Sequence, residues 1–267
     1  MRTALAFFKR DALMALSYRA SFAMQIIGSV IFVIVFCFLG KALDSGSNPV
    51  LARYGNSMTA YILIGVALAD CVGLSLTAFS NHIREGQLTG TLALTLASPT
   101  PLPLVLIYSS IWPYFFCAIR FIIFLIAGSL LFGVDLQTSG LPAALLIFVL
   151  TVVAFMGVGI LWASAVVLIK RGEALQATFS FLIWMLSGVL YPEAMLPAWM
   201  QPLSKAIPLT TALDGMRLAL LKGMGFADLS GRIFGLAAYA AVLMVVGLIA
   251  FNISIRTARE SGSLASY

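Results

Sequence analysis

The feature that most constrains this chain is a series of long apolar stretches without a charged side chain. Residues 141–169 and 233–255 contain no Asp, Glu, Lys or Arg. About 20 apolar residues are enough to cross the hydrocarbon core of a bilayer as a helix. The chain is 61% hydrophobic and only 10% charged, whereas a soluble domain is about 25% charged. These values exclude a soluble enzyme and a disordered chain, and they indicate an all-α integral membrane protein.

Six membrane spans are predicted from the apolar stretches. They cover residues 22–39, 57–80, 104–132, 141–169, 174–191 and 233–255. We expect residues 1–267 to form a single transmembrane domain, because no segment between the spans has the length or composition of a soluble domain.

Residues 1–21 are interrupted by charges and do not have the continuous apolar core of a signal peptide. On a helix, Leu5, Phe8 and Ala12 share one face, while Lys9 and Arg10 lie on another. This pattern predicts an amphipathic helix in the membrane interface. The alternative is the polar start of the first span.

The distribution of basic residues predicts the orientation in the membrane. One side of the six spans carries Arg2, Lys9, Arg10, Arg19, Arg84, Lys170, Arg171, Arg256 and Arg259. The other side carries fewer, and most of these lie in one long loop, which has less influence on orientation. Both termini are therefore expected in the cytoplasm. The net charge of +6 favours anionic membrane lipids as neighbours and not nucleic acid, since no basic stripe with interleaved aromatic residues is present.

Two segments between the spans have distinct patterns. Residues 81–99 form a short cytoplasmic stretch of helical character that ends at the prolines of positions 99, 101 and 103. Residues 192–222, on the external side, are broken by four prolines but are too apolar for a solvated loop. Short re-entrant or interfacial helices fit this external segment best.

No catalytic chemistry is recognisable in the chain. The only Gly-Lys pair, Gly40-Lys41, lacks the glycine-rich loop that cradles phosphates. His82 is the single histidine, so neither a histidine metal cluster nor a Ser/His/Asp set can form. We expect no catalytic residue, no bound metal and no cofactor on this chain. Cys37, Cys71 and Cys117 each fall in an apolar run without CxxC spacing and are expected to be small buried residues.

Asp70 and Arg120 are the only charges deep inside the predicted spans. Such residues are costly in hydrocarbon, and they face a pore, a partner or each other. Their predicted depths allow an ion pair between adjacent spans, and both alternatives, a structural pair and a pore lining, stay open. In the fifth span, Phe181, Trp184 and Met185 could line or close an apolar path.

Three motifs in order resemble the membrane subunit of an ABC-2 type exporter, a family of permeases for drugs, lipids and polysaccharides. They are KRD…SYR from Lys9 to Arg19, REG…GTL…SP from Arg84 to Pro99, and YPEAMLPAWMQPLSKAIPLTTALDGMR from Tyr191 to Arg217. The resemblance covers essentially the whole chain. One departure is Ala93, since such permeases often carry an acidic residue directly after Gly-Thr-Leu.

The resemblance implies a half-transporter. Two copies, or this chain with a homologous permease, would form the pore, and two separate ATP-binding cassette subunits would supply ATP and Mg²⁺ below it. Segment 81–99 would be the coupling helix, with the N-terminal helix as a second contact. The residues expected at the ATPase are Asp11, Arg19, Arg84, Glu85, Gly86, Leu88, Gly90, Thr91 and Leu92.

The resemblance also implies that the second and fifth spans meet across the dimer and form the gate. The expected path residues are Asp70, Arg120, Phe181, Trp184 and Met185. The expected residues of the external re-entrant segment are Tyr191, Pro192, Glu193, Pro197, Trp199, Asp214 and Arg217.

The sequence thus predicts the permease of an ATP-driven exporter that moves an amphipathic drug, lipid or lipid-linked glycan out of the cytoplasm or inner leaflet. One alternative is a secondary transporter driven by an ion gradient, although two isolated charges supply little of the relay that it needs. A second alternative is a transport-inactive membrane assembly factor. The resemblance places the chain in the bacterial inner membrane, which it is expected to cross several times with both termini in the cytoplasm.

Overall fold

The computed structural model describes residues 2–44, 51–88, 102–169 and 173–260, and these ranges contain helices and no strands. The α-helices are α1 (Arg2–Ser17), α2 (Arg19–Ala42), α3 (Met58–Leu88), α5 (Leu102–Phe132), α6 (Leu141–Ile169), α7 (Glu173–Leu186), α8 (Gln201–Lys205), α9 (Pro208–Lys222) and α10 (Ser230–Glu260). Three 3-10 turns are η1 (Ala52–Tyr54), η2 (Thr138–Gly140) and η3 (Glu193–Met195). The all-α prediction is confirmed.

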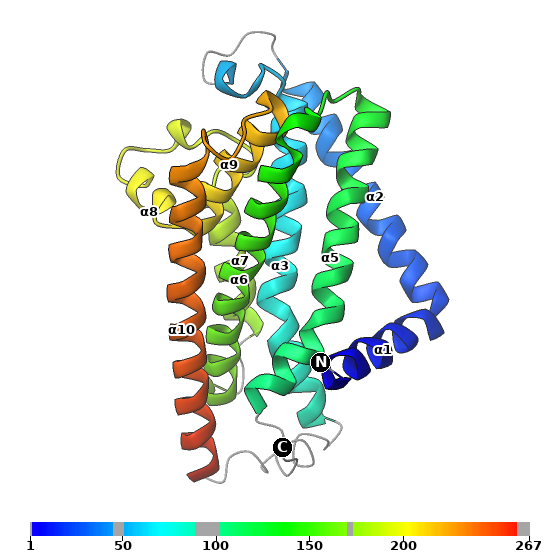
Figure 1. Ribbon diagram of the computed structural model, residues 1–267, viewed down its shortest axis with the longest axis vertical. Coiled ribbons are helices and arrows are strands. Elements are labelled where there is room, and N and C mark those ends of the chain that lie inside the picture. Colours follow the sequence, from blue (N-terminus) through cyan, green and yellow to red (C-terminus); the bar gives the residue numbers. More distant parts are fainter. Residues whose placement is uncertain (1, 45–50, 89–101, 170–172, 261–267) are drawn as a thin grey trace.

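Five of the described helices are long and apolar enough to cross a membrane. Their apolar stretches are Phe22–Ala42, Met58–Asn81, Ile107–Phe132, Thr138–Val166 and Ser230–Thr257. The stretches in α3, α5, α6 and α10 run along the long axis of the molecule, whereas α2 is inclined to it (Figure 1). The chain is therefore a multi-pass integral membrane protein.

The fifth predicted span differs from the structure. Residues 174–191 were expected to form one helix, but α7 ends at Leu186 and contains 14 residues. At a rise of about 1.5 Å per residue it is shorter than the roughly 30 Å of a hydrocarbon core. The chain turns at Gly188, whose φ of +71° is left-handed. Val189 and Leu190 continue the apolar run after this turn, so hydropathy alone did not locate the helix end. Six spanning helices are not confirmed.

The molecule has two distinct ends (Figure 1). α1 lies across one end, beside the end of α3 and the beginning of α5, and α8 and α9 lie toward the other end. α1 is a separate helix because Tyr18 leaves helical backbone geometry before α2 begins. The ring of Phe8 packs against Trp112 and Phe115 of α5, with centroids 5.5 and 5.4 Å away.

α3 forms the centre of the packed interior. In its apolar stretch 72% of the residues are buried, compared with 17% in α2 and in α10. A Cβ at Gly159 of α6 would collide with the backbone oxygen of Ser75, so α6 and α3 touch closely there. This observation agrees with the role of small residues at helix contacts in membranes.

α6 and α10 also meet backbone to backbone. A Cβ on Gly157 would lie 2.5 Å from the carbonyl carbon of Leu243, and a Cβ on Gly247 would lie 2.6 Å from the oxygen of Gly157. Neither neighbour is a flexible side-chain end that could move aside. Glycine at these two positions sets the distance between the helices.

We expect Gly157→Val to destabilise the protein by about 1–3 kcal/mol, because an overpacked contact forces helix backbones apart. Gly235→Val is the matched control, since Gly235 also lies in a spanning helix but has nothing within 4 Å of its Cβ position. Thermal unfolding of the two purified variants in detergent measures the difference. Equal unfolding midpoints would contradict the close contact of α6 with α10.

Candidate functional site

A cavity of about 540 Å³ opens between α2, α3, α5 and α7. Its lining is mainly apolar, with three rings contributed by Phe32, Phe181 and Trp184. The charged pair Asp70 and Arg120 also lines it. We refer to this space as the inner cavity.

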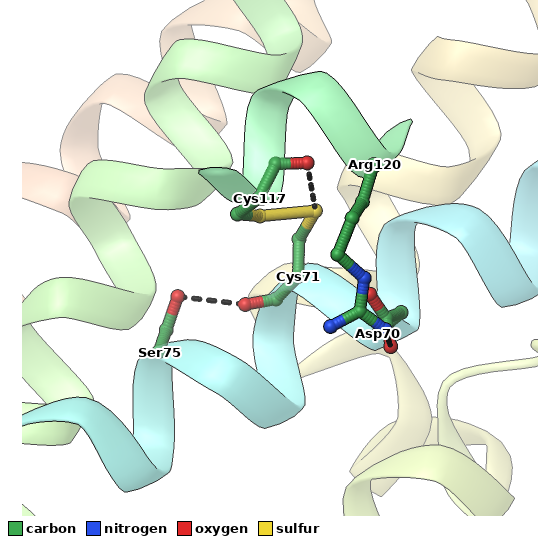
Figure 2. Close-up of a disulfide and its surroundings, with 5 residues drawn as sticks. All are labelled: Asp70, Cys71, Ser75, Cys117 and Arg120. Atoms are coloured by element: carbon green, nitrogen blue, oxygen red, sulfur yellow. Dashed lines mark hydrogen bonds and ion pairs between the residues drawn. A yellow bond between two sulfur atoms is a disulfide. The ribbon is translucent and has the colours of Figure 1, made fainter. Parts of the chain in front are cut away.

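Asp70 of α3 and Arg120 of α5 form the ion pair that the sequence allowed (Figure 2). The Nη2 atom of Arg120 donates a hydrogen bond of 2.6 Å to Oδ1 of Asp70. The two side chains are only 14% and 17% exposed. A structural pair and a pore lining were the alternatives. The structure shows the pair and places both side chains in the wall of the inner cavity, and the pore lining stays a prediction.

The pair is not fully satisfied. Within the described part of the protein, Oδ2 of Asp70 and Nε of Arg120 are buried and have no hydrogen-bond partner. Unpaired polar atoms in a low-dielectric interior cost free energy. One acceptor and one donor are therefore available beside the inner cavity.

A disulfide joins Cys71 to Cys117 one residue away from Asp70 (Figure 2). It connects α3 with α5, as the ion pair does, so two links hold these helices together at the same level. All three cysteines are buried as expected, but the pairing of Cys71 with Cys117 was missed. Nothing in their spacing indicated it, because the partners lie 46 residues apart on different helices.

The predicted path residues of the fifth span separate into two groups. Phe181 and Trp184 line the inner cavity, whereas Met185 is not part of its wall. The ring of Trp184 packs on Phe36 of α2 with centroids 5.6 Å apart. Phe32, Thr77 and Ser180 are further lining residues that were not predicted. Thr77 follows Asp70 by two helical turns, a spacing that places it on the same face and could have identified it.

At the opposite end, where α9 lies, one carboxylate, that of Asp214, binds side chains from three elements. Asp214 accepts hydrogen bonds from the Tyr54 hydroxyl and from Nε of Arg232, both at 2.6 Å, and from Nη2 of Arg53 at 3.4 Å. Burial and the bond to Asp214 raise the pKa of Tyr54, so its hydroxyl stays protonated and donates. Asp214 thereby joins η1, α9 and α10.

Arg217, one turn further along α9, is buried with 2% of its surface exposed. Its Nε and Nη2 atoms donate to the Tyr61 carbonyl at 3.3 and 3.2 Å, and Nη2 also donates to the carbonyls of Gly188 and Val189 at 3.0 Å. The guanidinium lies 3.4 Å from the centre of the Tyr61 ring. Burial lowers the pKa of Arg217, and Tyr61, Tyr54 and Asp214 oppose this shift. Arg217 thus fixes the turn after α7 against α3.

The other external residues surround this contact. Pro192 is buried and Glu193 begins η3, while Pro197 and Trp199 are exposed. The Tyr191 hydroxyl donates to the carbonyl oxygen of Met185. The segment contains η3, α8 and α9. The expectation that these short helices re-enter the membrane or lie in its interface stays a prediction.

Those residues expected at an ATPase that the structure describes lie near the end of the molecule that carries α1 (Figure 1). The backbone of Arg84, Glu85, Gly86 and Leu88 continues α3 to its last turn. The predicted helix over 81–99 therefore begins as part of α3, and Gly90, Thr91 and Leu92 lie outside the described residues. Arg19 begins α2 and is exposed, and Asp11 accepts a bond of 2.7 Å from its neighbour Arg10.

Comparison with known proteins decides the family. A sequence model described as ABC-2 type transporter matches residues 2–221. The chain belongs to this family. ABC-2 type transporter chains are membrane transport subunits and not ATPases, and membership in general implies partner ATPase subunits and dimerisation.

A curated relative of this ABC-2 chain is the linearmycin resistance permease protein LnrN of Bacillus subtilis (strain 168). The two are 31% identical over 134 residues, which is 49% of this chain and 33% of the relative. The match thus spans about one third of the relative's length. It supports the assignment to ABC transporter permeases and does not extend to the whole of that protein.

Proposed function

We propose that this chain is the permease subunit of an ATP-driven exporter of an amphipathic substrate, either a drug, a lipid or a lipid-linked glycan. The observation that carries the proposal is the inner cavity in a chain of the ABC-2 family. Its aromatic wall suits an apolar body, and the ion pair suits a polar group on that body. The relative's name, a linearmycin resistance permease, supports a drug.

In this proposal, Asp70, Arg120, Phe181 and Trp184 contact the substrate. The inner cavity borders α3 and α7, which correspond to the second and fifth predicted spans, and a second permease covers this side. Residues 1–267 act as one domain with six membrane passages, of which α7 and the segment after it make the fifth. The external segment 192–222 re-enters the outer leaflet.

ATP and Mg²⁺ bind to two partner ATPase subunits, and this chain holds no cofactor and performs no hydrolysis. The chain lies in the inner membrane. The end of the molecule with α1 faces the cytoplasm, since the basic residues concentrate there. The last turns of α3 and the residues up to position 99 contact the ATPase, with Leu88 and Leu92, four positions apart, filling its apolar groove. Closure of the ATPases then tilts α3 and α5.

The test is co-purification of a tagged permease with its ATPase. We expect Leu88→Asp combined with Leu92→Asp to lower ATPase recovery at least about tenfold, because buried apolar anchors dominate such interfaces. Phe226→Asp with Phe234→Asp is the control, as it also adds two negative charges, at exposed apolar positions in the other half of the chain. Both variants should remain membrane-inserted and dimeric.

Normal ATPase recovery and normal transport by the double variant would refute the coupling role. A secondary transporter or an assembly factor would retain no ATPase even as the wild-type chain. ATPase recovery with the wild-type chain therefore distinguishes the exporter from those alternatives. Transport driven by an ion gradient in vesicles without ATP would favour the secondary transporter.

A further inference from the structure

A second cavity, of about 420 Å³, lies near the ends of α3 and α7 that meet the external segment. Tyr61 of α3 and Ser187 after α7 line it, whereas Asp70 and Trp184 line the inner cavity. Nine residues separate Tyr61 from Asp70, so this outer cavity is roughly 13 Å further along α3. The two cavities are neighbours along the same pair of helices but have different chemistry.

The outer cavity is lined by more cations than carboxylates. Its basic residues are Arg53, Lys205, Arg217 and Arg232, and its acidic residues are Glu193 and Asp214. Asp214 already binds Arg53, Arg232 and Tyr54. Its negative charge is therefore shared between two arginines, and the wall has a net positive charge.

Three donors in this wall remain available. Ser187 is buried, and its hydroxyl has no partner in the described part of the chain. Lys205 forms no ion pair with any described residue within 4.0 Å. All four hydrogen bonds described for Arg217 use Nε and Nη2, so Nη1 can donate to a ligand. A buried hydroxyl beside one unpaired ammonium and a guanidinium nitrogen that the described bonds do not use is a donor set that suits an anion.

Two exposed apolar side chains precede Lys205 in the sequence. Trp199 and Leu203 are 69% and 52% exposed, and they lie six and two residues before this lining lysine. Exposed apolar side chains in the segment that supplies a cation to the wall suit a molecule with an acidic group and an apolar chain.

We propose that the outer cavity binds the anionic group, phosphate or carboxylate, of an amphipathic molecule. Lys205 and Arg53 attract the anion, Arg217 Nη1 and the Ser187 hydroxyl hold it, and the chain lies along Trp199 and Leu203. Two sources share this chemistry, a phospholipid of the outer leaflet and an acidic transported substrate. The site does not depend on the proposed direction of transport.

The experiment measures binding of dioctanoyl phosphatidylglycerol to the purified full chain by titration calorimetry in a non-ionic detergent. We expect Arg53→Gln with Lys205→Gln to weaken binding about tenfold and higher salt to weaken it further. Lys222→Gln is the matched control, because Lys222 is an exposed cation of α9 outside the cavity wall. Unchanged unfolding midpoints show that the variants are folded.

Equal affinity in all variants, or equal affinity for dioctanoyl phosphatidylcholine, would overturn the proposal. Inorganic phosphate that binds as tightly as phosphatidylglycerol would overturn the amphipathic part. In liposomes with the ATPase, a transported anion stimulates ATP hydrolysis in proportion to site occupancy, whereas a resident lipid binds without this stimulation. Loss of binding in the variants supports the anion site whether the ligand is a resident lipid or a transported substrate. The export proposal can therefore fail while the anion site is confirmed.

Discussion

Asp70→Leu is expected to destabilise the protein by about 3–5 kcal/mol, the range for removing one partner of a buried ion pair. The variant leaves the guanidinium of Arg120 without a carboxylate in a site where it is 14% exposed. Thermal unfolding and the monodisperse fraction after detergent extraction measure the loss. Asp135→Leu is the control, because Asp135 is exposed in the connection between α5 and η2 and its loss should change little.

The double variant Asp70→Leu with Arg120→Met separates the two roles of the pair. Removing both charges together is often neutral or stabilising for a buried pair, so the fold should recover. If the pair contacts substrate, this stable variant transports poorly. Full transport by the stable double variant would show that the pair only joins α3 to α5.

Arg217→Met is expected to cost roughly 2–4 kcal/mol. Hydrogen bonds from a charged group contribute about 1.5–3 kcal/mol each, but the cost of burying the charge, which Met does not have, offsets a large part of their sum. Without the guanidinium, the Val189 carbonyl loses the donor that the structure gives it. The Tyr61 hydroxyl still donates to Gly188 at 3.1 Å, so part of the turn stays fixed. Unfolding midpoints in detergent measure the effect.

Arg217→Lys should recover only part of this stability, because a single ammonium cannot reach the three carbonyls that the guanidinium spans. Lys222→Met, on the same helix but exposed, is the control. Protease cleavage after α7 in Arg217→Met would locate the damage at the turn. A midpoint equal to that of Lys222→Met would contradict the bracing role.

The spanning helices were predictable because their signal is local. An uncharged run such as 141–169 has one stable state in a bilayer, and α6 has the same bounds. The end of α7 was not predictable in this way. Gly188 breaks the helix inside an apolar sequence, and the groups that fix the turn, Tyr61 and Arg217, lie far away in the chain.

The candidate site was predictable in part. Two charges deep in spans have few stable arrangements, and Asp70 and Arg120 do pair. Phe32 and Ser180 were missed because an aromatic or a serine in an apolar run carries no sign of the face on which it lies. The contacts expected of Gly90, Thr91 and Leu92 stay predictions.

The unequal burial of the helices determines how much sequence change each can accept. Most of the apolar stretch of α3 is covered by other parts of the chain, whereas only 17% of the stretch in α10 is covered. On a surface that faces lipid, one aliphatic side chain replaces another at little cost. Under selection for folding, apolar substitutions should therefore be tolerated along α10, except at the Gly247 contact. In α3, side chains should be replaced only by others of similar volume. In a library of variants selected only for folding, the positions that do not change should therefore be those that form the interior of the bundle.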